Sequence, residues 1–279
     1  MTGNTLGWVI VAFVLYLLMM IAIGAFYAKG NNNSEDYFLG GRKLNGFVAA
    51  LSAQASDMSG WLLMGLPGAI YLTGVGGDGW IAIGLFIGTT LNWLFIATKL
   101  RRYTIRANNS VTLPTYFENR FHDEKKVLMA VSSITIVVFF LVYCASALSA
   151  GGQLFESVFG IDYHVALTIG ALVVLVYTFL GGFTAVCVTD FIQGMLMLVG
   201  ILAVPLFAYH FLTTGGTTLS AGLEASGADS ANFLNLMKNG DGSNNIISVI
   251  SGLGWGLGYF GMPHILVRFM AVRDCLLYT

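Results

Sequence analysis

The chain has 279 residues, of which 56% are hydrophobic and only 10% are charged, and its formal net charge is −1. Soluble domains carry roughly 25% charged residues, so this composition excludes an ordinary soluble enzyme or binding domain and indicates a membrane protein. No basic stretch is interleaved with aromatic residues, so no nucleic-acid partner is predicted.

Seven apolar stretches are long enough to cross about 30 Å of hydrocarbon as helices. In chain order they are Leu6–Ala28, Leu44–Leu72, Trp80–Thr98, Val127–Ala150, Val165–Phe183, Phe191–Leu212 and Ile246–Val267. The sequence therefore predicts an all-α, polytopic membrane protein with seven transmembrane helices in a lipid bilayer.

The basic residues predict how these helices are oriented. If the seven helices alternate in direction, twelve of the 13 Lys and Arg residues fall on one side, and only Lys238 lies opposite, in the polar loop 213–245. The positive-inside rule then places the N-terminus outside. The expected location is the plasma (inner) membrane. Residues 101–126 are expected in the cytoplasm, and the loop 213–245 outside.

Asp57 is the one charged residue within the seven stretches. An ionised Asp at this depth costs roughly 2.5–3.5 kcal/mol, so it is expected to have a partner, and a cation is the simplest one. Ser56, Ser59 and Gly60 surround it, and hydroxyls beside helix-breaking residues offer oxygen ligands. A site for a cation is favoured over a structural hydrogen bond that locks this helix to a neighbour.

Several long motifs carry a family resemblance. They are residues 36–42 (DYFLGGR), 56–68 (SDMSGWLLMGLPG), 177–183 (YTFLGGF) and 254–261 (GWGLGYFG). These stretches resemble the sodium/solute symporter family, and within it the sodium/proline symporter branch. The resemblance covers nearly the whole chain to about Val272.

The resemblance implies a thirteen-helix transporter with two inverted five-helix repeats (a 5+5, LeuT-like fold) after a leading helix. The implied parts are the leading helix and cytoplasmic loop (1–43), the first repeat (44–212), the external loop (213–245), the first helix of the second repeat (246–272) and a truncated end (273–279). Residues Cys275–Thr279 do not continue the family pattern and are interpreted as a scar. The remaining helices of the second repeat, with part of the ion site, are then missing.

The resemblance also implies site residues at the two helices that would be discontinuous. For sodium these are the backbone carbonyls of Ala55 and Met58, with Asp57 and Ser59 close by. For the substrate they are Gly60, Trp255, Tyr259 and Pro263. The last three are spaced by four, so a continuous helix would carry them on one face. The alternatives are close helix packing for Gly60 and packing or interface anchoring for the aromatic residues.

Two further residues have a coupling or gating role in the interpretation by resemblance. Two roles stay open for Arg42: anchoring at the cytoplasmic side of the membrane, and gating there. Asp190 is placed at the start of the helix Phe191–Leu212. Two roles stay open for it: an ordinary N-cap, and sodium-dependent coupling. The four histidines show no ligand spacing, so no other metal and no cofactor is predicted.

The leading functional hypothesis is sodium-coupled uptake of L-proline by alternating access. Nothing in the sequence pairs a nucleophile with a base, so an enzyme is not predicted. Two alternatives stay open: sodium symport of another small solute, such as a vitamin, sugar or sialic acid, and a symporter-like sensing module of a signalling protein. The oligomeric state is left open.

Overall fold

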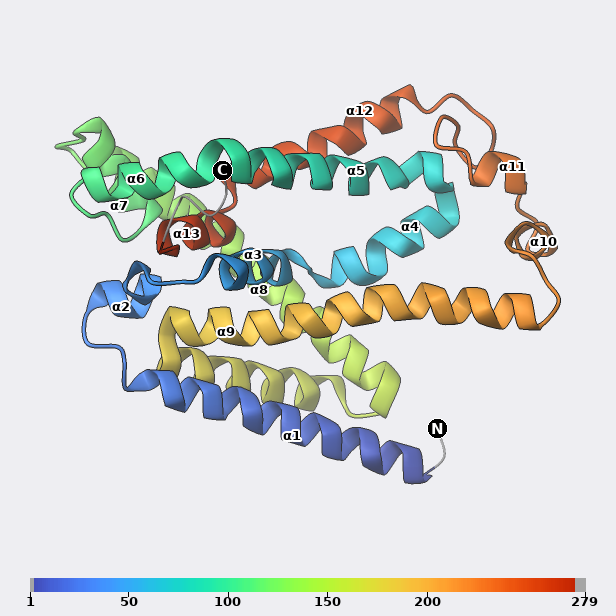
Figure 1. Ribbon diagram of the computed structural model, residues 1–279, viewed down its shortest axis with the longest axis horizontal. Coiled ribbons are helices and arrows are strands. Elements are labelled where there is room, and N and C mark those ends of the chain that lie inside the picture. Colours follow the sequence, from blue (N-terminus) through green and yellow to red (C-terminus); the bar gives the residue numbers. More distant parts are fainter. Residues whose placement is uncertain (1–2, 274–279) are drawn as a thin grey trace.

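The computed structural model describes residues 3–273, and within that range the regular elements are helices (Figure 1). The residues interpreted as a scar lie outside it. The elements are α1 (Gly3–Ala28), α2 (Ser34–Leu39), η1 (Gly40–Arg42), α3 (Gly46–Asp57), η2 (Trp61–Gly65), α4 (Leu66–Thr73), α5 (Val75–Asn92), η3 (Trp93–Ala97), α6 (Thr98–Arg106), α7 (Leu113–Phe121), α8 (Val127–Phe159), α9 (Tyr163–Thr214), α10 (Leu219–Ala225), α11 (Ser230–Phe233), α12 (Ile246–Trp255), η4 (Gly256–Gly261) and α13 (Pro263–Ala271).

Four helices of the described range are long and apolar enough to cross a membrane, and a bent pair raises the number to five. The four are Gly7–Ala28, Val75–Arg106, Val127–Phe159 and Tyr163–Thr214, and the pair is Ile246–Gly261 with Pro263–Ala271. The predicted class of helical, multi-pass membrane protein is confirmed. The predicted stretch 44–72 is not among these helices because it is divided into α3, η2 and α4. The count of seven spans therefore stays a prediction.

The longest helix, α9, is two antiparallel limbs joined at Gly182. Its 52 residues would extend about 78 Å if straight, more than twice the thickness of the hydrocarbon core. Gly182 has φ 61° and ψ −159°, which is not helical, and the chain reverses direction there (Figure 1). The second limb begins directly after the reversal, so the expected loop before Phe191 is absent and Asp190 lies inside a helix.

The reversal requires a glycine. A Cβ atom at residue 182 would lie 2.9 Å from the Tyr37 carbonyl oxygen of α2, and a positive φ is strained for any other residue. The two limbs and α1 lie side by side (Figure 1). A glycine at one position thus fixes how α9 packs against the first helix and against α2.

The polar connections gather at opposite ends of the long dimension of the molecule. Helices α2, α6, α7 and α13 lie at one end, and α10 and α11 of the loop 213–245 lie at the other (Figure 1). Arg101, Arg102 and Arg106 belong to α6, a helical extension of α5 and η3, rather than to a loop. Between the ends, α8 exposes Phe139 and Leu141, as expected of a lipid-facing helix.

Helix α5 holds α12 and η4 at backbone contact. A Cβ atom at Gly84 would lie 2.2 Å from the Gly252 carbonyl oxygen, and one at Gly88 would lie 2.2 Å from that of Gly256. Small residues four apart on both helices let membrane helices approach this closely. The contact places the C-terminal end of α5 beside η4, where the functional side chains gather.

We predict that Gly182→Ala destabilises the full-length protein by about 1–3 kcal/mol, because the new methyl group meets the Tyr37 carbonyl at a strained φ. The measurement is the thermal unfolding midpoint of purified protein in detergent. Gly170→Ala on the first limb of the same helix is the control, since nothing lies within 4 Å of its Cβ position. Equal midpoints for the two variants would contradict this account of the reversal.

Candidate functional site

The predicted interruption of the stretch Leu44–Leu72 is present in the structure. Helix α3 ends at Asp57, and the last hydrogen bond of its backbone runs from Met58 N–H to the Gln54 carbonyl at 3.2 Å. Met58 is extended, with φ −67° and ψ 90°, and the chain resumes after Ser59 as the wide π-helix η2. Such π turns occur often at functional sites because they leave the regular backbone ladder.

A second interruption lies in the stretch Ile246–Val267. Helix α12 tightens into the 3₁₀-helix η4, Met262 is extended (φ −75°, ψ 108°), and α13 then leaves at a bend of 49°. Pro263 explains the bend, because a residue before proline avoids the α conformation and proline is tolerated in the first turn of a helix. Both interruptions were predicted from glycine, serine and proline positions.

The expectation that Trp255, Tyr259 and Pro263 share one face was wrong. A 3₁₀-helix turns about 120° per residue, so positions four apart differ by about 120° in direction rather than about 40°. The bend at Met262 separates Pro263 further. Pro263 lines an apolar groove with Leu113 and Val267 at the α7–α8–α13 side, away from the two aromatic residues.

The two broken helices meet at Asp57. The Tyr259 hydroxyl donates a short hydrogen bond to Asp57 Oδ2, and the carboxylate side chain is only 11% exposed. Trp61 is four residues after Asp57, and Trp255 is four residues before Tyr259. Their rings stack with centroids 4.7 Å apart and planes inclined by 8°. These contacts join residues about 200 positions apart, and they bring Asp57, predicted for sodium, together with Tyr259 and Trp255, predicted for the substrate.

Helices α8 and α13 complete the surroundings of the carboxylate. The Tyr143 hydroxyl donates to the Ser56 carbonyl at 3.3 Å, and the Tyr143 ring stacks on His264 at 5.8 Å. His264 Nε2 lies 4.0 Å from Asp57 Oδ1. No hydrogen bond reaches either ring nitrogen of His264 within the described residues, although both are buried.

The other residues of the first break lie against neighbouring helices. Ala55 is buried next to Gly194 of α9, where a Cβ atom would lie 3.4 Å from the Ala55 methyl. A Cβ at Gly60 would lie 2.8 Å from that of Ala150 on α8. Gly60 is therefore required for packing in this conformation, which is the alternative that the sequence left open. Met58 and Ser59 form the break itself.

Asp190 forms a buried polar cluster on the other side of α3, and it is not an N-cap. Its Oδ2 accepts hydrogen bonds from Ser52 at 2.8 Å and Ser56 at 3.0 Å, and it pairs with Arg268 Nη2 at 2.7 Å. Arg268 Nε also donates to Ser52 Oγ at 2.7 Å. Because Ser56 directly precedes Asp57 in α3, the cluster lies next to the meeting of the breaks.

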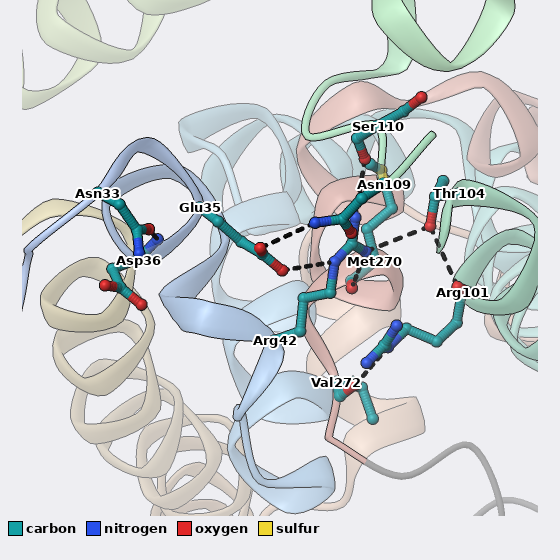
Figure 2. A network of polar contacts seen from close by, with 10 residues as sticks. All are labelled: Asn33, Glu35, Asp36, Arg42, Arg101, Thr104, Asn109, Ser110, Met270 and Val272. Carbon is teal, nitrogen blue, oxygen red and sulfur yellow. Dashed lines mark hydrogen bonds and ion pairs between the residues drawn. The ribbon is translucent and has the colours of Figure 1, made fainter. Parts of the chain in front are cut away.

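Arg42 is the centre of a second network, at the end of the molecule formed by α2, α6, α7 and α13 (Figure 2). The residue is 6% exposed, so it is not a free anchor in the headgroup region. Its guanidinium binds Glu35 at 3.0 Å, Thr104 Oγ1 at 3.2 Å, and the carbonyls of Ser110 at 2.8 Å and Met270 at 2.9 Å. Arg42 thus ties four segments together, and Arg101 of α6 adds a bond to the Val272 carbonyl at 2.6 Å (Figure 2).

Sequence reasoning missed several residues that the structure brings to the site. Arg268 was counted only as a basic residue after the last helix, whereas it is 4% exposed on α13. Ser52, at four residues before Ser56, was not noted, and Asn92 and Tyr143 come from helices without a charge. No local pattern in the sequence indicated these contacts, because each joins segments far apart along the chain.

We predict that Arg268→Ala destabilises the full-length protein by about 3–5 kcal/mol, because it leaves the Asp190 carboxylate buried without its cation. Lys126→Ala is the matched control. The Lys126–Glu118 pair spans 3.6 Å, its Lys side chain is 63% exposed, and such pairs contribute about 0–1 kcal/mol. Thermal unfolding in detergent measures both, and a loss no larger for Arg268→Ala than for the control would contradict the buried ion pair.

Comparison with known proteins gives a consistent family. The model of the sodium:solute symporter family matches residues 37–277. The sodium/proline symporter of Salmonella typhimurium is 48% identical over 94% of this chain and 50% of its own length. The high-affinity proline transporter PutP of Bacillus subtilis is 48% identical over 91% of this chain and 52% of its own.

A solved structure shares the fold. A sodium-coupled sialic acid symporter in a substrate-bound, outward-open state superposes with a TM-score of 0.75 at 19% identity, over 94% of this chain and 53% of that one. This chain spans about half the length of the curated relatives it matches. With the family model covering most of its length, the chain belongs to the sodium:solute symporter family.

Proposed function

We propose that the protein containing this chain takes up L-proline together with sodium across the plasma membrane by alternating access. The observation that carries the proposal is the Asp57 carboxylate, held where two broken helices meet and bonded across the gap by Tyr259. Discontinuous helices that face each other near the midplane are the common site of ion and substrate binding in transporters. The similarity to proteins named for sodium and proline indicates the two solutes.

In this proposal sodium binds on the α3 side of the meeting point. Sodium is a hard cation and takes oxygen ligands. The Asp57 carboxylate supplies charge, and the carbonyls of Ala55 and Met58 with the Ser59 hydroxyl supply neutral oxygens at the break. Sodium at this position offsets the buried negative charge and orders the break. By linkage, proline that favours the ordered break must raise sodium affinity by the same factor.

Proline, in this proposal, binds beside the stacked indoles. The ring of proline is compact and apolar, and the half-exposed faces of Trp61 and Trp255 suit it. The zwitterionic head needs polar partners, which the free N–H groups after the break at Gly60 and the Tyr259 hydroxyl can offer. Pro263 does not form a wall of this pocket in the proposal. It is the first residue of α13 and accounts for the bend before that helix.

Arg42 and Asp190 serve coupling through the position of α13. Asp190 holds Arg268 in the middle of that helix, and Arg42 holds its last turn at the Met270 carbonyl. Because His264 lies in the first turn of α13, 4.0 Å from Asp57, a change at Asp57 can reach both networks through this one helix. Opening the Arg42 network toward the cytoplasm would then be the inward-facing step of the cycle.

The proposed topology has seven spans in the present chain, with the two limbs of α9 and the divided segment α3–η2–α4 each crossing once. Single cysteines at Lys125 and Ser226, in a protein freed of its own cysteines, are expected to react with a membrane-impermeant reagent from opposite sides. Ser226 reacts in intact cells and Lys125 only after permeabilisation, as the basic residues predict. Reaction of both from one side contradicts the topology.

The decisive experiment for function is L-proline uptake into proteoliposomes of the full-length protein, with and without an inward sodium gradient. We expect uptake to need the gradient and to be competed by proline rather than by sialic acid or a sugar. Uptake that ignores the gradient contradicts sodium coupling. Binding of proline without any uptake favours the sensing alternative.

Asp57→Asn should raise the sodium concentration for half-maximal uptake by about tenfold or more, because it removes the charge and keeps the shape. Glu156→Gln near the end of α8 is the control and should leave that concentration unchanged. Expression and the unfolding midpoint are measured for both variants in the same preparations. A normal sodium requirement in the Asp57 variant would reduce the residue to a packing role.

A further inference from the structure

A small cavity lies on the α5 side of the meeting of the breaks. Its volume is about 10 Å³, roughly the room that one water molecule or one dehydrated cation of similar size needs. Five polar side chains line it: Gln54 and Asp57 from α3, Thr89 and Asn92 from α5, and Tyr259 from η4. Each of these side chains carries an oxygen atom, and one of them carries a negative charge.

Asn92 is the residue that distinguishes this cavity from ordinary packing. It is 1% exposed, and its Nδ2 donates to the Tyr259 carbonyl at 2.8 Å. Its Oδ1 is buried and accepts no hydrogen bond from any residue of the described range. The amide cannot be reversed to remove the problem, because the Tyr259 carbonyl accepts only and so fixes Nδ2 toward itself. A buried acceptor left in this way costs about 1–3 kcal/mol unless something occupies the cavity.

Charge decides what the occupant is. A water molecule could donate to Asn92 Oδ1, but it would leave the Asp57 carboxylate without a compensating positive charge. His264 lies 4.0 Å from Asp57 and is charged only when protonated, and the nearby Arg268 is already paired with Asp190 at 2.7 Å. A small cation satisfies both demands at once, because it neutralises the carboxylate and accepts electron pairs from the neutral oxygens.

We propose that this cavity binds a dehydrated sodium ion and that Asn92 Oδ1 is one of its ligands, with Asp57, Gln54, Thr89 and Tyr259 around it. The proposal rests on sodium coupling and adds to the Asp57 carboxylate a set of ligands from α5. Asn92 then has two connected tasks. Its oxygen binds the ion and its nitrogen holds the Tyr259 carbonyl, so that one side chain links the ion to the helix that carries the aromatic residues.

The test uses the full-length protein, purified in detergent and in proteoliposomes. The first readout is the rise in thermal unfolding midpoint as NaCl replaces choline chloride without proline, which reports ion binding alone. The second is the ratio of half-maximal sodium and lithium concentrations for proline uptake. A residue that only supports packing has no reason to change that ratio, whereas a ligand does because the two ions differ in size.

Asn92→Leu keeps the volume and removes the oxygen, so it should raise the sodium midpoint by about tenfold or more and change the sodium-to-lithium ratio. Thr90→Val is the matched control. Thr90 lies on the same helix, and its hydroxyl is bonded back to the Phe86 carbonyl at 2.8 Å. It should leave both readouts as in the unaltered protein. An unchanged sodium midpoint and ratio in Asn92→Leu, with weaker proline binding, would show that Asn92 only holds Tyr259 and would overturn the site.

Asn92→Asp keeps the test decisive if the leucine variant does not fold. A second carboxylate in the cavity should tighten cation binding and admit Ca²⁺, seen as a calcium-dependent rise in the unfolding midpoint that Thr90→Val lacks. The same cation response in Asn92→Asp and the unaltered protein overturns the proposal. Failure of sodium coupling itself is separate, because it would show as gradient-independent uptake in the unaltered protein.

Discussion

A carboxylate buried in an apolar protein sets the conditions for the rest of this structure. Asp57 lies at the end of α3, and its charge can be kept there only with donors and a cation around it. The Tyr259 hydroxyl is the donor that the described chain provides, and it comes from the other interrupted helix. The two interruptions are thus connected through one hydrogen bond. Neither interruption alone would bring oxygen atoms together in sufficient number for an ion.

A second carboxylate, Asp190, differs from Asp57 because the protein itself provides its cation. Its charge is neutralised inside the protein by Arg268 and by two hydroxyls, so it needs no ion in this conformation. The contrast is informative because the two acids are close neighbours. Ser56 of α3 donates a hydrogen bond to Asp190 of α9, and Asp57 is the next residue of α3. This difference between the two acids is what the proposed binding of a mobile cation at Asp57 rests on.

Local sequence patterns were sufficient to predict where the two helices are interrupted. They were insufficient to predict which side chains meet around the interruptions. Pro263 and the glycines around Trp255 act on their own backbone, so their effect could be predicted without a fold. The partner of Asp190 could not be, because Arg268 lies 78 positions away and its burial depends on how α13 packs. The expectation of one shared face failed for a related reason, since the choice of 3₁₀ winding in η4 depends on contact with α5.

The reversal of α9 at Gly182 also depends on a contact between distant segments. Hydropathy predicted two antiparallel helices with a loop at residues 184–190 between them, whereas the second limb begins directly after Gly182. The physical cause is the Tyr37 carbonyl of α2, which lies against the glycine and leaves no room for a side chain. Such a contact between distant segments has no signature in the hydrophobic pattern.

The glycine contacts of α5 restrict where the structure can move. Gly84 and Gly88 meet Gly252 and Gly256 backbone to backbone, with no flexible side chain between them to absorb sliding. The first half of the second interrupted helix must therefore travel with α5 as one body. Asn92 extends this attachment to the carbonyl of Tyr259, within the 3₁₀ segment η4. The extended residues Met58 and Met262 lie outside this packed unit, each within three residues of the Asp57–Tyr259 bond. In the proposed function, an ion that strengthens or weakens that bond therefore acts next to both interruptions.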